Sequence, residues 1–346
     1  MPYQREYQKR IRAAVIGVGS HCYRNILPVL NFLPVQLVAV CDPNESLVRK
    51  TAQQYGCRWY TSSSELYRGE PEVEAVFLCV GPVQHPVLAA EALRAGKHVW
   101  MEKPAACRAH QIADLIKMRG DHTVVVGLKK AFMPAAAKAR EIAGSAEYGG
   151  LNSILAVYHM KFPENRNEIL SRDDGTPNWL RNGVHPLAFL SSVGGPARDV
   201  TAITNNAGYG AVVIRFKNGV VGTLHLSSGP QPDVESYSLF ADQWQMKIEN
   251  ARIELRRGIP FIYGETFNYA PPGDDSGTVV WDTENCVATL ENKPEFTQGF
   301  YWEMKHFCDC VLEGKKPEMG TLEDTLEIMK IYEAALASEG RPVEII

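Results

Sequence analysis

The sequence predicts an α/β protein in which a domain built on a parallel sheet precedes an α+β domain with an open, mostly antiparallel sheet. Three observations predict this. Short apolar runs alternate with helix-like stretches as far as residue 127, and longer strands follow one another beyond it. A glycine-rich loop directly follows the first apolar run. The length of 346 residues exceeds what one hydrophobic core usually serves, so we expect two domains, 1–127 and 128–346.

Five short apolar runs of the first part are predicted to be strands, at 12–17, 35–41, 73–80, 98–101 and 123–127. They are continuous and rich in β-branched residues, which is typical of strands covered on both faces. Helices are predicted between them at 46–55, 86–95 and 109–118, and Gly96 follows the second helix as a left-handed cap. Strand and helix alternating at this spacing indicate a parallel sheet with helices on both sides.

The second part begins with a predicted helix at 134–143 and continues with strands at 152–162, 198–206, 209–216, 220–227, 237–249 and 251–255. Lys217, Asn218 and Gly219 form a hairpin signal, because Asn and Gly tolerate the positive φ of a tight turn. A Pro- and Gly-rich loop is expected at 271–277, and helices return at 299–313 and 322–339. Successive strands joined by short turns predict an antiparallel sheet.

Composition argues against several classes of function. The 40 acidic and 36 basic residues give a net charge of −4 without a basic run, so we expect no nucleic-acid partner. No apolar stretch approaches the roughly 20 residues of a membrane span, and the first ten residues are too polar for a signal peptide. The eight cysteines include no CxxC pair, so we expect reduced thiols, no metal site and a cytoplasmic protein.

The glycine-rich loop at 17–22 (GVGSHC) is typical of a dinucleotide site. Gly17 allows the tight turn after a strand, and Gly19 lets the backbone approach a pyrophosphate at the N-terminus of the following helix. Cys22 stands where the strict pattern has a third glycine. Asp42 ends the second predicted strand, where a carboxylate accepts hydrogen bonds from the adenosine ribose. An acid there repels a 2′-phosphate, so the sequence favours NAD over NADP.

Three further segments make the chain similar to a known family. Residues 79–85 (CVGPVQH) close the predicted strand at 73–80, the sequence Glu102-Lys103-Pro104 follows the strand at 98–101, and residues 321–346 close the chain. Together with the glycine loop, these segments resemble the Gfo/Idh/MocA oxidoreductases, which include glucose–fructose oxidoreductase and the inositol dehydrogenases. The resemblance runs from about residue 11 to the end, and the Glu-Lys-Pro turn is its most specific element.

The resemblance implies an NAD(P)-binding Rossmann domain, followed by a domain whose open sheet makes subunit contacts in a homo-oligomer, a dimer or tetramer. It implies hydride transfer between nicotinamide and a carbinol carbon of a small sugar-like substrate. Lys103 would lie beside the reacting hydroxyl and stabilise a developing alkoxide. The cofactor contacts that the loop and the resemblance predict are Gly17, Gly19, Ser20, His21, Asp42, Cys79, Gly81, Pro82, His85, Glu102 and Lys103.

One segment departs from the pattern of the family. Members usually carry Asp-x-Gly-x-His and another Asp three residues later, and the histidine is the usual proton acceptor. Here Gly183 and His185 fit, but Arg181 and Ala188 stand in the places of the two acids. The resemblance therefore assigns His185 as the catalytic partner of Lys103, without the neighbouring carboxylate. An imidazole suits proton exchange because its ordinary pKa is about 6.5.

The arginine at position 181 predicts an acidic sugar or hydroxy acid as substrate. If the segment is helical, Arg181 lies one turn before His185 and presents a fork that suits a carboxylate or phosphate. Asn178 and Trp179 are also expected to bind substrate, because an aromatic ring can stack on a sugar face. Further positive charge is expected in the same pocket from Lys129, Lys130, Arg166 and Arg172.

Two alternatives stay open at this point. Loss of the acid can mean loss of catalysis, which leaves an NAD(P)-binding sensor or regulator of the same fold, because a nearby arginine disfavours imidazolium. The presence of both Lys103 and His185 argues against that alternative. Redox-assisted glycoside cleavage also occurs on this fold, and no residue of the chain singles it out.

Overall fold

The computed structural model describes all residues except 1–5, 230–234, 259–275, 286, 288, 290 and 291. Its internal contacts divide the chain into two units. The first unit consists of Met1–Phe132, Ser171–Thr176 and Gly299–Met329, and the second of Met133–Leu170, Pro177–Gln298 and Lys330–Ile346. The division at 127/128, between cofactor and substrate binding, stays a prediction about function.

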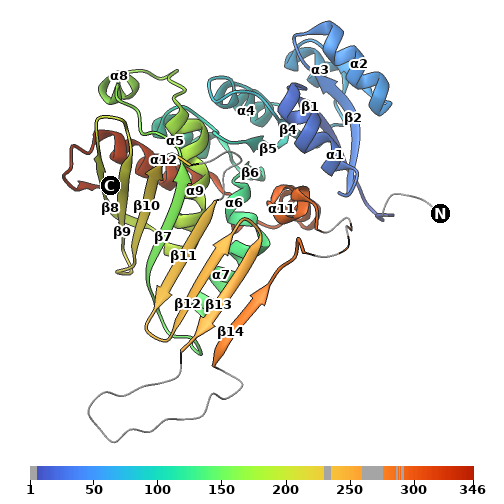
Figure 1. Cartoon of the computed structure of the whole chain (residues 1–346). Helices are drawn as coiled ribbons and strands as arrows, with labels where there is room; N and C mark the ends of the chain where they lie inside the picture. The colour runs from blue at the N-terminus through green and yellow to red at the C-terminus, as the bar shows by residue number, and fades with distance from the viewer. Residues whose placement is uncertain (1–5, 230–234, 259–275, 286, 288, 290–291) are drawn as a thin grey trace, which may run out of the picture. The chain divides into compact units, whose positions relative to one another are not determined.

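A six-stranded parallel sheet forms the centre of the first unit, in the order β3-β2-β1-β4-β5-β6 (Figure 1). Its strands are β1 (Ile11–Ile16), β2 (Val35–Cys41), β3 (Arg58–Tyr60), β4 (Ala75–Leu78), β5 (His98–Glu102) and β6 (Val124–Gly127). β4 and β6 are buried throughout, as their continuous apolar runs predicted. The order reverses between β1 and β4, and such sheets bind ligands beyond the carboxyl ends of their strands at that point. The predicted α/β class is confirmed.

The helices of this unit are η1 (Cys22–Ile26, π-helical), α1 (Leu27–Leu30), α2 (Glu45–Tyr55), α3 (Ser63–Gly69), α4 (His85–Arg94), α5 (Ala109–Met118) and α6 (Lys129–Phe132). α2 shows how the sequence sets their ends. The side chain of Asn44 accepts a hydrogen bond of 3.1 Å from the Leu47 amide, and Gly56 closes the helix at a φ of +64°. Sequence reasoning missed β3 and α3, because β3 has only three residues and no apolar run.

A helix from the far end of the sequence completes the first unit. α11 (Phe300–Glu313) contacts β1, β5, β6 and α6. Its Phe307 meets Phe77 of β4 edge-on, with 5.5 Å between the ring centroids. The helix was predicted, but its packing was not, because an apolar stripe does not state which sheet it covers. α12 (Leu322–Ala337) contributes residues to both units.

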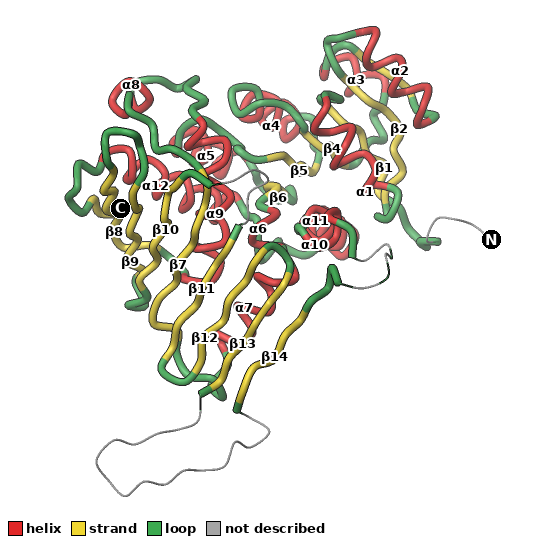
Figure 2. The backbone as a smooth tube through the Cα atoms, viewed as in Figure 1, coloured by secondary structure: helices red, strands yellow, loops and turns green. Residues whose placement is uncertain are grey.

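A nine-stranded mixed sheet forms the second unit, in the order β14-β13-β12-β11-β7-β10-β9-β8-β15 (Figure 2). The strands are β7 (Leu151–His159), β8 (Ala197–Thr204), β9 (Gly210–Phe216), β10 (Val221–Ser227), β11 (Ser236–Ala241), β12 (Trp244–Glu249), β13 (Arg252–Arg257), β14 (Gly277–Trp281) and β15 (Val343–Glu344). β7 and β10 pair in parallel, and the other neighbours in this order pair antiparallel. The mostly antiparallel sheet is therefore confirmed.

One predicted strand of the second unit was wrong. Residues 237–249 form two strands, β11 and β12, joined by a turn at Asp242 and Gln243. The buried positions are Tyr237 and Leu239 before the turn but Trp244 and Met246 after it, so the alternation changes phase there. The predicted hairpin is present, with Gly219 at a φ of +93°. Residues 271–275 of the predicted loop lie outside the described residues.

Helices cover one face of the nine-stranded sheet. The helices of this unit are α7 (Pro134–Gly144), α8 (Arg166–Leu170), α9 (Asn178–Gly194) and α10 (Pro294–Thr297). α9 contacts β7, β10 and α7. On the other face, alternate residues such as Leu155 and Val221 are exposed. Across the part of the chain that the structure describes, no helix is long and apolar enough to span a membrane.

Candidate active site

The glycine loop is tight on one side and open on the other. Gly17 has a φ of +90°, its amide donates to the Cys41 carbonyl over 2.8 Å, and an added Cβ would lie 2.5 Å from the Cys79 carbonyl oxygen. Only glycine fits there. A Cβ on Gly19 would meet nothing within 4 Å, and Ser20 is exposed. The loop therefore fits a pyrophosphate that approaches the backbone at Gly19.

Asp42 lies where a ribose-binding carboxylate belongs. It directly follows β2, and its Oδ2 accepts a hydrogen bond of 3.0 Å from the Val18 amide of the glycine loop. Its Oδ1 accepts a hydrogen bond of 2.9 Å from the Asn44 amide. The two bonds fix the carboxylate beside the loop and leave each oxygen a lone pair for a ribose hydroxyl.

The segment after β4 forms the wall next to the loop. The Cys79 carbonyl packs against Gly17, and burial raises the pKa of the Cys79 thiol well above its ordinary value, which disfavours the thiolate. Gly81 is half-buried and Pro82 is buried. The sequence assigned Cys79, Gly81 and Pro82 to the cofactor site. They follow β4, so they lie at the carboxyl edge of the parallel sheet.

His85 supports the Glu-Lys-Pro turn from behind. The ring is fully buried, and its Nδ1 lies 2.8 Å from the Pro104 carbonyl oxygen, to which it donates. Burial lowers the pKa of His85, which favours the neutral ring. The predicted contact between this ring and a cofactor is corrected accordingly, because a fully buried ring beside protein carbonyls has no open face to offer.

Glu102 connects the Glu-Lys-Pro turn to the glycine loop. It ends β5 and is 4% exposed, and its Oε1 lies 2.9 Å from Nε2 of His21. Asn25 Nδ2 donates to His21 Nδ1 over 3.1 Å, so Nε2 carries the ring proton and donates to Glu102. The second oxygen of Glu102 accepts from the Lys103 amide over 3.0 Å. His21 thus connects the glycine loop, to which it belongs, to the Glu-Lys-Pro turn.

Two lysines with lowered pKa values follow neighbouring strands. Burial lowers the pKa of Lys103, after β5, and the negative charges of Glu102 and Glu303 oppose this. Burial and the charge of Lys130 lower the pKa of Lys129, after β6, to about 8. The Lys129 Nζ lies 4.3 Å from the centroid of the Phe300 ring. Perturbed pKa values in such a cluster are typical of a functional site.

The segment that contains His185 is helical, and the proposed role of Arg181 in binding an anion beside His185 depended on this. Both residues lie in α9, where His185 is 8% exposed and Arg181 is exposed. Asn178, at the start of α9, accepts a hydrogen bond of 2.5 Å from Asn182. Lys103 belongs to the first unit and His185 to the second, so their pairing stays a proposal.

Trp179 corrects a prediction. It is fully buried, and its indole N–H donates to the Tyr332 carbonyl over 3.3 Å. Phe162 packs at 4.9 Å between ring centroids, and a Cβ on Gly183 would lie 2.6 Å from the indole. Its ring faces are therefore covered by the core of the second unit and cannot stack on a sugar.

A pocket lies at the carboxyl ends of β7 and β10, and its lining includes Asn178 and Trp179, which the sequence assigned to substrate binding. Because these neighbours run parallel, His159 and Ser227 end at the same edge, where His159 Nδ1 lies 3.3 Å from the Ser227 hydroxyl. The pocket has a volume of about 510 Å³, and Asn178 contributes to its wall. Lys161 lines it too, with its Nζ 5.4 Å from the centroid of the Tyr209 ring. The strand pairing brings His159 and Ser227 to this pocket, and no local sequence signal encodes that pairing.

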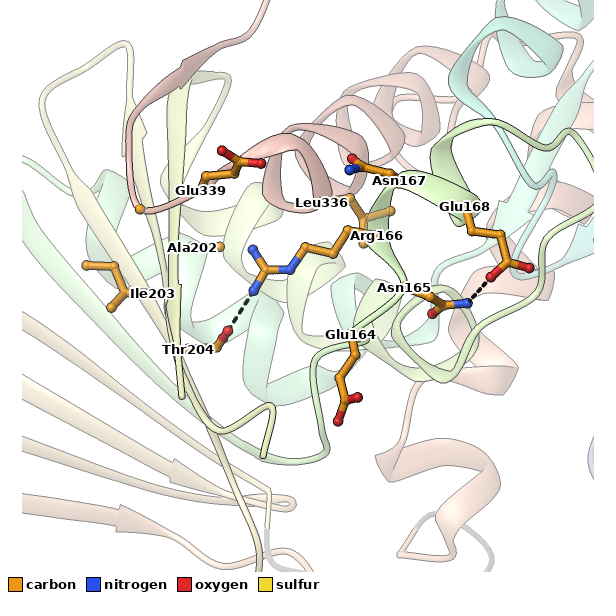
Figure 3. Close-up of a pocket in the computed structure, with 11 residues that line it drawn as sticks. Glu164, Asn165, Arg166, Asn167, Glu168, Ala202, Ile203, Thr204, Leu336 and Glu339 are labelled. Atoms are coloured by element: carbon orange, nitrogen blue, oxygen red, sulfur yellow. Dashed lines mark hydrogen bonds between the residues drawn. The ribbon is translucent and has the colours of Figure 1, made fainter. Parts of the chain in front are cut away.

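Two arginines expected beside the substrate are occupied elsewhere. Arg166 donates to the Ser338 carbonyl over 2.8 Å and to the Thr204 hydroxyl over 2.7 Å, in a second pocket of about 610 Å³ (Figure 3). Arg172 pairs with Asp174 at 2.9 Å. Both predicted roles are corrected, because these guanidinium groups already bind protein oxygens. Across the described residues, no group of three or more His, Cys, Asp or Glu side chains could hold a metal ion.

The comparisons identify the first unit. Residues 11–129 match the Gfo/Idh/MocA family model, described as "Oxidoreductase family, NAD-binding Rossmann fold". The resemblance inferred from the motifs is confirmed by this match. This part of the chain is an NAD-binding Rossmann domain.

Individual relatives extend the similarity beyond this domain. The chain is 27% identical over 233 residues to 1-carboxy-3-chloro-3,4-dihydroxycyclo hexa-1,5-diene dehydrogenase of Comamonas testosteroni, over 63% of this chain and 58% of that protein. The chain thus spans little more than half the length of this relative. It is 22% identical to scyllo-inositol 2-dehydrogenase (NAD(+)) of Bacillus subtilis, over 98% of this chain and 97% of that protein.

A solved structure shares the fold of the whole chain. GenD2 from gentamicin A biosynthesis, determined in complex with NAD, matches with a TM-score of 0.76 and 21% identity. The match covers 100% of this chain and 99% of that chain.

Proposed function

We propose that the protein is an NAD(H)-dependent oxidoreductase that interconverts a hydroxyl and a carbonyl group on a small sugar-like substrate, with Lys103 and His185 as its catalytic pair. One observation carries the proposal. An NAD-binding domain holds a half-buried lysine centre, Lys103 and Lys129, after β5 and β6, and His21 and Glu102 connect that centre to the glycine loop. Residues 1–127 then bind the cofactor, and residues 128–346 bind the substrate.

The residues at the glycine loop fit NAD. Gly17 makes the turn, Gly19 leaves room for the pyrophosphate, and Asp42 is placed for the adenosine ribose. Three further residues, Cys79, Gly81 and Pro82, follow β4 beside the loop. Ser20 and His21 belong to the loop, and Glu102 contacts it through His21. When bound, NAD supplies the nicotinamide carbon that exchanges a hydride with the substrate. The carboxylate of Asp42 favours NAD over NADP, because it repels a 2′-phosphate.

Lys103 acts on the substrate oxygen. Lys103 is half-buried, and the desolvation that lowers its pKa also lets an ammonium group there stabilise a developing negative charge more strongly than it would in water. Glu102 accepts a hydrogen bond from the Lys103 amide and so fixes the backbone from which the side chain extends. Lys129 adds a second positive charge beside it below pH of about 8.

His185 exchanges the substrate proton, and the second unit recognises the substrate. Helix α9 carries His185, Arg181 and Asn178 on successive turns. The pocket lined by His159, Lys161 and Asn178 offers the hydrogen-bonding groups that a polyol needs. The Comamonas relative is named for a carboxylated ring diol and the Bacillus relative for an inositol, so we propose a ring alcohol as substrate, and an acidic one if Arg181 binds it.

We also propose that the protein is cytoplasmic and forms a homo-oligomer, a dimer or tetramer, through the open face of the nine-stranded sheet. Leu155 and Val221 are exposed on that face, and Leu155 lies opposite Ser238 in β11. Light scattering on the wild type and on Leu155→Lys tests this. A monomeric wild type would contradict the proposal.

A substrate panel tests the activity. NAD and NADP are each offered neutral polyols, aldoses, aldonic acids and uronic acids, and reduced nicotinamide is followed by its absorbance. Turnover confined to acids supports an anion-binding Arg181, and equal turnover of neutral polyols removes that role. NADH binding without any turnover favours the other candidate function, a sensor of the same fold, in which Arg181 replaces a catalytic acid.

A further inference from the structure

A fully buried carboxyl lies beside the lysine centre, and the proposed mechanism does not use it. Glu303, in the first turn of α11, is 0% exposed. Across the described residues, neither of its carboxylate oxygens has a hydrogen-bond partner. Such a carboxyl destabilises the folded state, and an apolar side chain of similar size would stabilise it more. A destabilising group among functional residues points to a role at that site.

The end of β6 leaves room for this carboxyl. Gly127, the last residue of β6, pairs in register with Glu102 of β5. A Cβ on Gly127 would lie 3.3 Å from Glu303 Oε1 and 2.9 Å from Trp100 Cζ2, so glycine provides the space. The carboxyl therefore lies at the ends of two strands: Lys103 directly follows β5, and Lys129 follows β6 after Leu128.

The charges around Glu303 come from each element packed against it. These titratable groups are Glu102 and Lys103 at the end of β5, Lys129 in α6 and Cys79 after β4. Lys130 acts in turn on Lys129. The negative charge of Glu303 raises the pKa values of Lys103 and Lys129, against the effect of burial. Burial raises the pKa of Glu303 itself well above its ordinary value, Glu102 adds to the rise, and the two lysines oppose it.

We propose that Glu303 is a positioning residue of the lysine centre, a buried carboxyl that exchanges protons in step with Lys103 and Lys129 and so controls their charge. With Glu303 ionised, both amines hold their protons as ammonium groups. When a proton enters the carboxyl, this attraction is lost, and a lysine releases its own proton to solvent or to a substrate oxygen more readily. The inference rests on the proposed function, since Glu303 acts on the substrate only through Lys103.

The test measures the lysines directly, in protein without substrate or NAD. Wild type and Glu303→Gln are labelled with acetic anhydride from about pH 6 to about pH 11, and mass spectrometry gives the extent at Lys103 and Lys129 relative to the exposed Lys117. Gln keeps the shape and removes the charge, so we expect both labelling midpoints to fall by about one pH unit. The pKa of the alkaline limb in the pH profile of kcat/KM should fall together with these midpoints, and the affinity for NADH should stay unchanged.

Glu70→Gln is the matched control. Glu70 is also fully buried in the first unit, but it accepts from the Tyr60 hydroxyl at 2.8 Å and pairs with Arg58 at 3.1 Å. This variant should lower Tm and leave the labelling midpoints of Lys103 and Lys129 unchanged. If Glu303 served packing alone, Glu303→Gln would likewise lower Tm and leave both lysine midpoints unchanged.

Two further variants of Glu303 keep the test decisive if the Gln variant is unstable. Glu303→Met should raise Tm and lower the lysine midpoints, whereas Glu303→Asp keeps the charge and should restore them towards wild type. Unchanged midpoints in folded Gln or Met variants overturn the inference. Lowered midpoints in a protein that turns over no substrate uphold it and contradict the proposed function instead.

Discussion

The carboxyl edges of the two sheets hold their polar groups in different ways. At the ends of β5 and β6, burial lowers the pKa values of Lys103 and Lys129 and raises that of Glu303. At the ends of β7 and β10, the pocket is open, His159 is half-buried and Lys161 is exposed. The first edge holds buried carboxyls beside half-buried lysines, and the second is wide and polar.

We propose that this difference corresponds to a division between the chemical step and substrate recognition. A charge acts strongly on a reacting atom only where water is scarce. An open polar pocket exchanges water for substrate hydroxyls with little loss of hydrogen bonding, which suits recognition of a polyol. We therefore expect variants at the first edge to change rates and variants at the second to change substrate affinity.

Lys103→Ala should have the largest effect. We expect kcat to fall about 10³-fold, because the charge opposite the developing alkoxide is lost, while NADH affinity in a fluorescence titration stays within about twofold. Lys97→Ala is the control, since this buried lysine before β5 donates only to the Pro71 carbonyl at 2.9 Å in the described structure. Its kcat should stay near wild type, and full activity of Lys103→Ala would remove Lys103 from the mechanism.

Asp42→Ala should have the next largest effect, on the cofactor alone. Loss of hydrogen bonds to a charged acceptor removes about 1.5–3 kcal/mol, which is about a tenfold or greater rise in the Kd of NAD. The preference for NAD over NADP should shrink as the repulsion disappears. Isothermal titration with both dinucleotides measures this, with Glu45→Ala, an exposed acid of α2, as control. An unchanged ratio of the two affinities would disprove the role of Asp42.

Lys161→Ala should change substrate affinity and leave the chemical step intact. We expect KM to rise about threefold to tenfold with kcat within about twofold, because an exposed hydrogen bond contributes about 1 kcal/mol. Lys217→Ala, in the hairpin turn, is the control. A fall in kcat without a change in KM would place chemistry at the second edge.

Lys129→Met should give the smallest effect, a rise in Tm. The folded pKa of about 8 lies below the ordinary lysine value of 10.5, so the amine destabilises the fold fully below pH of about 8. That penalty shrinks as pH rises towards 10.5, so the gain in Tm should be largest near pH 7 and smaller near pH 10. Differential scanning calorimetry measures both, with exposed Lys117→Met as control. A gain independent of pH would mean that packing, and not charge, causes it.

The first edge was largely predictable because its signals are local. Continuous apolar runs indicate the parallel strands, Gly17 is required by its backbone angle and by the nearby Cys79 carbonyl, and Asp42 follows its strand directly. The Glu-Lys-Pro turn likewise marks Lys103 through consecutive residues alone, since the motif directly follows a predicted strand.

The remainder depends on contacts between distant segments. Glu303 lies 200 residues beyond Lys103 in the sequence (303 − 103), and a helix pattern does not say that it returns to the first sheet. The parallel pairing of β7 with β10 likewise has no local signal, so the sequence predicted Asn178 of the pocket at their ends but not His159 or Ser227. Trp179 was assigned to substrate because burial of an aromatic ring cannot be read from its neighbours in sequence.

The central claim is that Lys103, at the end of β5, serves the chemical step and that the pocket at the ends of β7 and β10 recognises the substrate. The most direct test is the single-turnover oxidation of enzyme-bound NADH, measured against concentration of the first keto substrate found, in Lys103→Ala and Lys161→Ala side by side. The maximal rate should fall about 10³-fold only in Lys103→Ala, and the half-saturating concentration should rise only in Lys161→Ala. Equal losses of both quantities in both variants would contradict this division.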